Sequence, residues 1–489
     1  MINFGEFLPD QPAMASAGAT VAKNVIPALK GYRSYRELSA VSGVATNDIL
    51  SLYAGKDDAG NGALYVGDSG KLYKMAAADS SLTDKSKSGG YSTASGDKWN
   101  FVQFGETLVA TNFTNPPQTA TVDTGSVFAD LGGSPPKGKF VTIVKDEVFF
   151  GYTNDSDDVK PYRVRWSAIN SATGWTVGTA LADYQDVVDV GDCTGLVGGE
   201  YLIALFERGI VRATFVGAPL VYQFDRLTNQ IGCSVPGSVT SVGPGMVFFL
   251  SENGFHMLKG NSVVPIGAEK INKWFLDRFK IAHSENMCAS VDPINQNVIW
   301  AYPNTSSVDG SNNEILIYNY NLNRWSYVEQ ATTALAPLFT AGYTLENLDN
   351  ISSSIDALPA SLDSAMWRGG SFFFAGAKDK KVQSFTGDRL AATIETGEFD
   401  VSPGKRSLVN NIIPYVTSAS GTAPTISATI GSRLRQNDAV SFGTASSQNA
   451  DGYCPVRSSG SFHRVRLSLS GDWEQAQGID VDIQPMGLR

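Results

Sequence analysis

Apolar residues along the chain recur mostly at every second position or in short runs, and Gly, Asn, Asp or Pro interrupt them. This pattern is typical of β-strands joined by tight turns. Helical spacing is confined to one stretch, Ala268–Ile281, which predicts a short helix. The apolar residues at that spacing are Ile271, Trp274, Phe275 and Phe279. The sequence therefore predicts an all-β protein with one short helix.

An internal repeat underlies the strand pattern. Seven segments share one plan, an apolar strand followed by a polar turn and a second strand, and successive segments start about 51 residues apart on average. They start at about Leu64, Leu108, Val148, Leu202, Met246, Val298 and Phe372. The spacing is close to the ~40–50 residues of a four-stranded propeller blade. Because radial packing of blades buries sheet faces that a lone blade leaves exposed, we expect a β-propeller of six or seven somewhat irregular blades over residues 46–400.

The same repeats could also pack as irregular hairpins in stacked β-sandwiches, which is the alternative to a propeller. The number of blades is also open, because the last interval of 74 residues has room for another blade. Aromatic residues near strand ends, namely Trp99, Trp166 and Trp325, are expected to pack between blades. The long polar stretch Thr332–Ala365 is expected to be an interaction loop, with a poorly ordered segment as the alternative.

Two regions fall outside the repeat. Residues 1–45 contain FLPDQP and KNVIPALKGYRSYREL, without clear alternation, and predict an N-terminal arm that becomes ordered on assembly. Residues 401–489 contain well-alternating strands such as HRVRLSLSG and predict a small antiparallel domain resembling a β-sandwich.

Charge and composition narrow the function. The chain has 489 residues, with 38 Lys+Arg against 48 Asp+Glu and a net charge of −10, which disfavours gripping of DNA phosphates over a broad surface. The four Cys lie far apart and are expected to be buried free thiols. No basic segment followed by an apolar one opens the sequence, and no apolar run approaches the ~20 residues that span a bilayer, so we expect a soluble protein made in a cytoplasm and used without a membrane-spanning segment.

Candidate chemistry is sparse. Asp155, Asp157 and Asp158 have spacing that resembles a calcium loop, but the Gly and Glu of an EF-hand are missing, so turn charges are expected, with an incidental cation site as the alternative. The spaced glycines of Gly195–Tyr201 precede a strand rather than a helix, which disfavours a phosphate loop.

Catalytic motifs are equally weak. Cys288 lies near His283 in the sequence, but we expect Cys288 to be a buried thiol and not a catalytic nucleophile. Ser251–Leu258 and Ser171–Thr176 resemble the repeat that accompanies sialidase sites without its Asp. We therefore assign no catalytic, cofactor-binding or metal-binding residues and expect a structural protein, not an enzyme.

Several segments carry a family resemblance. Besides FLPDQP and KNVIPALKGYRSYREL, they are DKWNFVQFGETLVATN, PYRVRWSAIN, GGEYLIALFERGI, FFLSENGF and HRVRLSLSGDWEQAQGIDVD. The chain resembles bacteriophage virion proteins, with the tail hub, nozzle and packaged-DNA-stabilisation proteins of short-tailed phages as the nearest functional analogues. The resemblance implies a virion protein assembled in the bacterial host cytoplasm. It also implies a hexameric ring below the portal and head-tail adaptor, contacts with tail fibres or spikes, and genomic DNA passing through the lumen without specific binding. For such a protein, the alternative role of the Thr332–Ala365 loop is a constriction that holds DNA back.

Charge is consistent with that role, since six copies of a −10 chain carry −60 and an acidic lumen repels duplex DNA. The rival hypothesis is a propeller that binds or cleaves glycans. It predicts Arg, Tyr and carboxylate side chains converging in a pocket at one propeller face. A third hypothesis is a non-enzymatic scaffold outside any virus.

Overall fold

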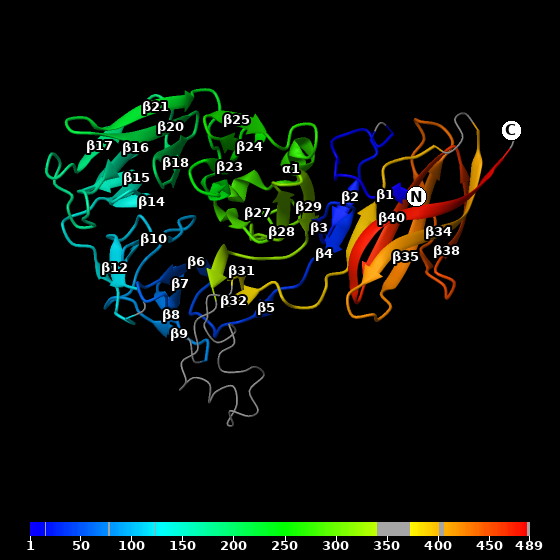
Figure 1. Ribbon diagram of the computed structural model, residues 1–489, viewed down its shortest axis with the longest axis horizontal. Coiled ribbons are helices and arrows are strands. Elements are labelled where there is room, and N and C mark those ends of the chain that lie inside the picture. The colour runs from blue at the N-terminus through cyan, green and yellow to red at the C-terminus, as the bar shows by residue number, and fades with distance from the viewer. Residues whose placement is uncertain (15, 77–78, 123, 340–371, 401–404, 487–489) are drawn as a thin grey trace.

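The computed structural model contains the whole chain, and the structure describes residues 1–14, 16–76, 79–122, 124–339, 372–400 and 405–486. Two lobes make up the molecule (Figure 1). The larger lobe, here called the body, contains small sheets built from β5 (Ser39–Ala40) to β32 (Lys381–Ser384). The second, here called the C-terminal lobe, contains the strands after residue 391 together with strands from the N-terminus.

Four-stranded sheets build the body, and in most of them the chain passes through neighbouring strands in sequence order. The first sheet contains β6 (Ile49–Lys56), β7 (Gly62–Asp68), β8 (Leu72–Met75) and β9 (Leu82–Asp84). The second contains β10 (Asn100–Phe104), β11 (Thr107–Thr111), β12 (Gln118–Thr121) and β13 (Ala129–Asp130). The third contains β14 (Lys137–Val144), β15 (Glu147–Asp155), β16 (Asp158–Trp166) and β17 (Asp183–Asp186).

Further along the chain the same plan continues. The fourth sheet contains β18 (Cys193–Val197), β19 (Leu202–Phe206), β20 (Ile210–Gly217) and β21 (Val221–Thr228). The fifth contains β22 (Thr240–Ser241), β23 (Met246–Ser251), β24 (Gly254–Lys259) and β25 (Ser262–Pro265). The sixth set, β26 (Cys288–Asp292), β27 (Asn297–Tyr302), β28 (Glu314–Asn319) and β29 (Arg324–Val328), belongs to a larger sheet. The seventh joins β30 (Leu335–Phe339), β31 (Phe372–Lys378) and β32 to β5 from the N-terminal segment.

The repeat in the sequence corresponds to these sheets. Each of the seven predicted starts falls in the second strand of one set: β7, β11, β15, β19, β23, β27 and β31. Neighbouring sets pack on each other, and the first strand of the seventh, β30, contacts the first strand of the first, β6. The prediction of an all-β protein built from repeated small sheets is therefore confirmed, and the arrangement is compatible with a propeller.

The three tryptophans expected between repeats lie between sheets. The indole Nε1 of Trp99 donates to the Asp68 carbonyl of the preceding sheet at 2.8 Å. Trp166 contacts Tyr222 of the following sheet with ring centroids 5.3 Å apart. Trp325 donates to Ile266, next to the fifth sheet, at 3.2 Å. This part of the prediction is confirmed.

The C-terminal lobe contains two facing sheets. One has the order β3 (Val25–Pro27), β4 (Tyr32–Ser34), β40 (Trp473–Pro485), β34 (Ser407–Ser418) and β38 (Cys454–Gly460), with β1 (Ile2–Asn3) also on β40. The other has the order β2 (Val21–Lys23), β33 (Ala392–Glu395), β39 (Phe462–Ser470), β35 (Thr425–Arg433) and β36 (Ser441–Phe442), with β37 (Ser446–Ser447) also on β35. Alternating burial along β39 puts Val465, Leu467 and Leu469 in the core.

The N-terminal segment is ordered within its own chain, so the expectation that it orders on assembly is wrong. Its strands β1 to β4 complete the two sheets of the C-terminal lobe, and β5 completes the seventh sheet of the body. Hydrogen-bonded strands thus cross both predicted boundaries, at 45 and at 400, since β33 pairs with β39.

Two local predictions have different outcomes. The helix is confirmed as α1 (Asn272–Arg278), shorter than predicted, with Phe275 buried; the 3-10 turns η1 (Pro236–Ser238) and η2 (Ile281–Asn286) accompany it. The loop predicted from Thr332 starts too early, because Leu335–Phe339 pair with β31 as β30. The rest of that loop, from 340, lies outside the described residues.

Within the described ranges, no helix is long and apolar enough to cross a membrane.

Candidate functional site

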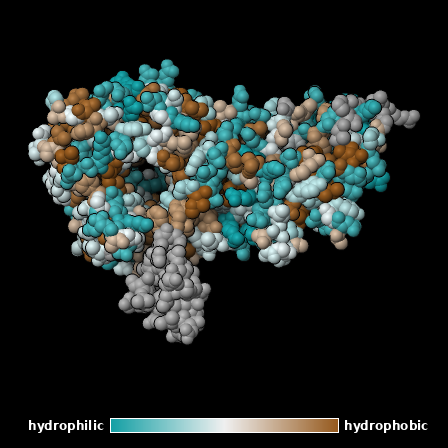
Figure 2. Space-filling model, in the orientation of Figure 1, coloured by the Kyte–Doolittle hydropathy of each residue, from teal (hydrophilic) through white to brown (hydrophobic). Residues whose placement is uncertain are grey.

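Two hollows of similar size are the candidates for a functional site. The first lies near the middle of the body, where the space-filling view is hollowed (Figure 2), and has a volume of about 420 Å³. Its wall comes from the first strand of every sheet or from the turn before it, for example Leu52, Phe101, Phe140, Leu196 and Leu335. This hollow is called the central cavity below.

The chemistry of the central cavity is largely structural. The ammonium of Lys98 donates to the carbonyls of Asn286 at 3.0 Å and Met287 at 2.7 Å, and burial lowers its pKa. Burial also raises the pKa of the nearby Cys288 thiol. Among the described residues that line the cavity, Glu285 is the one carboxylate and there is no arginine. The converging groups of the rival hypothesis are therefore not found at the centre of the body.

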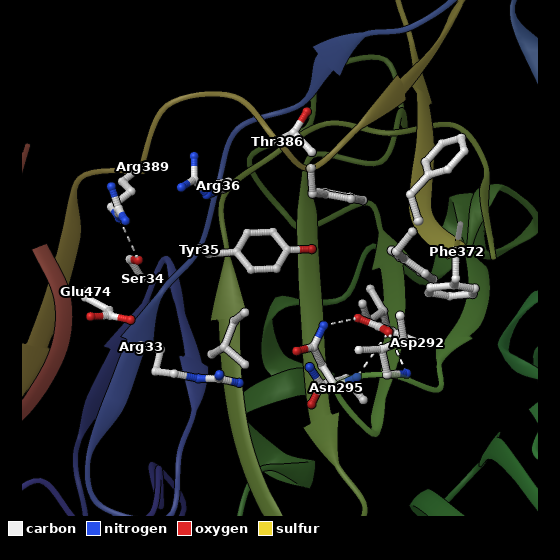
Figure 3. Close-up of a pocket in the computed structure, with 17 residues that line it drawn as sticks. Arg33, Ser34, Tyr35, Arg36, Asp292, Asn295, Phe372, Thr386, Arg389 and Glu474 are labelled. Carbon is white, nitrogen blue, oxygen red and sulfur yellow. Dashed lines mark hydrogen bonds between the residues drawn. The ribbon is translucent and has the colours of Figure 1, made fainter. Parts of the chain in front are cut away.

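The second hollow lies where the two lobes meet and has a volume of about 450 Å³ (Figure 3). It is called the interlobe pocket. Its wall combines β3 and β4 from the N-terminal segment, β27 and β31 from the body, and Glu474 from β40. Three distant parts of the sequence thus meet at one site.

Charged side chains gather on the N-terminal side of the interlobe pocket. Arg33, Arg36, Arg389 and Glu474 lie there (Figure 3). Arg389 is engaged, since it pairs with Asp472 at 2.5 Å and donates to the Ser34 hydroxyl at 3.2 Å. Arg36 donates to the Gly387 carbonyl at 3.0 Å. Among the residues that the structure describes, Arg33, Arg36 and Glu474 form no ion pair.

Asp292 lies on the opposite side of the pocket and already has partners. Its carboxylate accepts hydrogen bonds from the backbone of Ile294 at 3.1 Å and from the Asn295 side chain at 2.6 Å. These bonds shape the turn between β26 and β27, so Asp292 has a local structural task.

Tyr35 projects into the pocket from the residue after β4, and Figure 3 shows its hydroxyl directed toward the interior. The side chain is 5% exposed, and its hydroxyl makes no hydrogen bond to any residue in the described part of the chain. Burial, reinforced by the charge of Asp292, raises the pKa of Tyr35 far above its usual value. The phenol is therefore protonated at neutral pH and can donate a hydrogen bond, but it does not act as an anionic nucleophile.

An apolar wall completes the interlobe pocket. Phe385 lies between two other rings, with centroids 5.2 Å from Tyr35 and 5.7 Å from Phe374. Ile26 and Ile299 pack in the same cluster. The pocket thus has a charged, hydroxyl-bearing side and an aromatic side, a combination typical of sites for small polar ligands with one apolar face.

The residues singled out in the sequence occupy separate places. Asp155 of β15 pairs with Arg165 of β16, and Asp158 pairs with Lys160 within β16 at 3.0 Å. No group of three potential metal ligands occurs in the described ranges. The four cysteines are buried free thiols, as expected.

The sequence-based search missed the interlobe pocket. Its residues Arg33 and Tyr35 lie in the stretch GYRSYRE, where the pair Tyr-Arg occurs twice, three residues apart. Tyr32 and Tyr35 are buried whereas Arg33 and Arg36 are exposed, and a spacing of three is not the alternation by which a strand is recognised.

Comparison with known proteins assigns the chain to no family. No family model matches the chain, and no curated protein matches it. A computationally designed protein of known structure is 10% identical, with 72% of this chain and 99% of that chain covered and a TM-score of 0.36. The extracellular domain named for a one-component system from B. thetaiotaomicron is 9% identical, with 89% of this chain and 61% of that chain covered and a TM-score of 0.42.

Proposed function

We propose that the protein is a structural component of a bacteriophage tail, of the hub or nozzle type, whose body is a seven-bladed β-propeller. The return contact from β30 to β6 and the completion of the seventh sheet by β5 support the propeller. The central cavity also supports it, because its wall comes from the first strands of six sheets and from the turn before the first strand of the fifth. The resemblance of segments over most of the chain to phage virion proteins supports the assignment to a tail.

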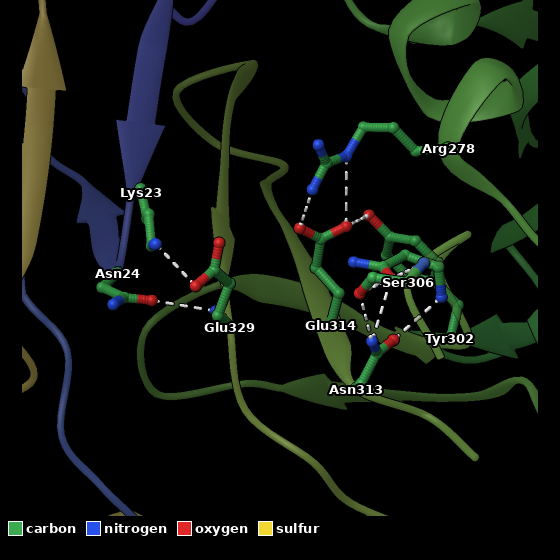
Figure 4. Close-up of polar contacts among 9 residues, drawn as sticks. Lys23, Asn24, Arg278, Tyr302, Ser306, Asn313, Glu314 and Glu329 are labelled. Carbon is green, nitrogen blue, oxygen red and sulfur yellow. Dashed lines mark hydrogen bonds and ion pairs between the residues drawn. The ribbon is translucent and has the colours of Figure 1, made fainter. Parts of the chain in front are cut away.

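The observation that carries the proposal is the hydrogen-bonded connection between the lobes. Strand β2 pairs with β29 of the body and with β33 of the C-terminal lobe, so one ten-stranded sheet runs through both. Lys23 forms an ion pair with Glu329 at 2.5 Å, and Asn24 accepts a hydrogen bond from the Glu329 backbone at 2.8 Å (Figure 4). A wall subunit of a tail needs such a fixed geometry, whereas independent domains usually move on a linker.

The central cavity restricts how such a protein conducts DNA. A volume of about 420 Å³ accommodates a drug-sized molecule and not a DNA duplex. The lumen of the proposed ring therefore lies between subunits, with six copies below the portal and adaptor, and genomic DNA slides past an acidic wall without specific binding. Tail fibres or spikes attach to the outer surface of this ring, and the protein catalyses no reaction.

The experiment is imaging of intact virions with the protein labelled by an epitope tag at the exposed turn around Asp58. The expected result is a tail-associated ring with six copies for each particle, and no density within the centre of each body. Label on the capsid, a soluble monomer absent from particles, or a copy number that does not form a closed ring would overturn the proposal.

Glycan recognition is the second candidate function, and the interlobe pocket favours it. Arg, Tyr and carboxylate side chains do converge there, although between the lobes rather than on the face of the body. The protonated state of Tyr35 and the turn bonds of Asp292 favour binding over cleavage.

A further inference from the structure

The interlobe pocket contains polar groups that the folded chain leaves without partners. Tyr35 is buried, but its hydroxyl opens into the pocket, and neither this hydroxyl nor the exposed Arg33 guanidinium has a hydrogen-bond partner for its side chain in the described part of the chain. A molecule in the pocket can take the place of water and accept hydrogen bonds from these groups. The pocket therefore offers polar groups to an occupant that brings hydrogen-bond acceptors.

The charges on the wall indicate what the occupant carries. Arg33 and Arg36 lie on the same side of the pocket, and each is free of an ion pair with the described residues. Guanidinium groups bind planar carboxylates through two parallel hydrogen bonds. Glu474 on the same side accepts hydrogen bonds from hydroxyl groups. A ligand with one carboxylate and several hydroxyls matches both features.

The opposite wall indicates the shape of the occupant. Phe385 and Phe374 stack at 5.7 Å with an interplanar angle of 25°, and Tyr35 adjoins them. A flat C–H surface such as one face of a pyranose ring packs on this wall, while its hydroxyls face the polar side. The volume of about 450 Å³ lies in the range of small-ligand sites.

From this combination we infer that the interlobe pocket binds an acidic saccharide, a sugar that carries a carboxylate. Arg33 holds the carboxylate; Tyr35 donates to a ring or hydroxyl oxygen; Glu474 accepts from a hydroxyl; and the aromatic wall covers the apolar face of the sugar. The site is built by one chain and does not depend on the proposed ring, so it is testable on the purified protein.

The test is isothermal titration of the full chain with methyl glucuronide and with sialic acid, alongside glucose and acetate. We expect an acidic sugar to bind and glucose and acetate to bind at least about tenfold more weakly. Arg33→Gln is expected to weaken binding about 10–100-fold and Tyr35→Phe about fivefold, the effects of losing a charged and a neutral hydrogen bond. Arg208→Gln and Tyr415→Phe are matched controls, because Arg208 and Tyr415 are exposed and lie outside the pocket.

Other outcomes overturn the inference. Absence of binding by both acidic sugars, equal binding of glucose, or acetate binding as tightly as the sugars would each do so, the last because the pocket would then recognise charge alone. Unchanged affinity in Arg33→Gln, with circular dichroism showing a folded protein, would also place the sugar elsewhere. Glu474→Gln is a second variant, expected to lower affinity for the sugar but not for acetate.

Discussion

Trp99 packs directly on Gly67 of the neighbouring sheet. A Cβ atom built at Gly67 would lie 2.6 Å from Cδ1 of the Trp99 ring, and the indole of Trp99 donates to the next residue, Asp68, at 2.8 Å. The missing side chain of the glycine therefore makes room for the ring that joins the first and second sheets.

From this contact we predict that Gly67→Ala destabilises the protein by about 1–3 kcal/mol, because the methyl group must displace a buried ring in a packed core. Gly245→Ala is the control, since the nearest heavy atom to a Cβ there is 3.9 Å away. Urea unfolding followed by tryptophan fluorescence measures both variants. Equal stability of Gly67→Ala and the wild type would contradict the packing described here.

Arg324 anchors the N-terminal segment to the body. Its buried guanidinium donates to the carbonyls of Gly5 at 2.6 Å and Phe4 at 3.2 Å, and also to that of Ala28. Arg324→Ala removes these hydrogen bonds, although the Gly5 carbonyl still accepts one from the Tyr32 hydroxyl. We expect a loss of roughly 3 kcal/mol and cleavage of the N-terminal segment in limited proteolysis.

Two variants test the geometry of this anchor. Arg324→Lys keeps the charge but not the planar fork, and we expect it to be destabilised, though less than Arg324→Ala. Arg226→Ala removes an exposed ion pair with Asp189 and is the control, with an expected effect below about 1 kcal/mol. An N-terminal segment that resists proteolysis equally in Arg324→Ala and the wild type would refute the anchoring role.

Asp10 caps α1 from a distant part of the chain. Its carboxylate accepts hydrogen bonds from the backbone of Lys273 and of Trp274, both at 2.8 Å, whereas Ile271 at the N-cap position has no capping side chain. We predict that Asp10→Ala costs about 1 kcal/mol and that Asp10→Asn costs less. Asp58→Ala, at an exposed turn, is the control. The same loss in both alanine variants would show that the cap contributes nothing.

Local patterns in the sequence predicted the body well and its edges poorly. The repeat starts, α1 and the tryptophans between sheets follow from short-range apolar periodicity, which the structure preserves. The pairing of β2 with β33, or of β5 with β32, joins segments more than 300 residues apart, and no periodicity in either segment encodes its partner. The interlobe pocket depends on those pairings, which is why its residues were not recognised.

The four cysteines are expected to be unreactive in the folded protein. Burial raises the pKa of Cys193 to about 12 and that of Cys233 to about 11, and it also raises the pKa of Cys288 and Cys454. The thiolate is the reactive form, and a raised pKa lowers its concentration at pH 8. A thiol-reactive dye should modify none of the four in native buffer and all four in denaturant. Rapid modification in native buffer would show that the thiols are accessible.

His463 should make the C-terminal lobe sensitive to mild acid. The buried ring lies between two hydroxyls, Ser432 at 2.8 Å from Nδ1 and Ser407 at 2.8 Å from Nε2. Burial lowers the pKa of His463, although the Gly460 carbonyl and the carboxylates of Asp400 and Glu398 oppose that shift. Below a pH of about 6.5 the unfolded chain takes up a proton at this residue that the folded chain resists.

The free energy of unfolding should therefore fall as the pH drops below about 6.5, and this contribution should level off once the folded protein also binds the proton. Urea unfolding between pH 7.5 and 5 measures the slope, and His463→Gln should have a shallower slope than the wild type whatever its absolute stability. His283→Asn is the matched control, because the His283 side chain is 37% exposed. If His463→Gln retained the full slope, the acid sensitivity would have to come from the carboxylates and not from the buried imidazole.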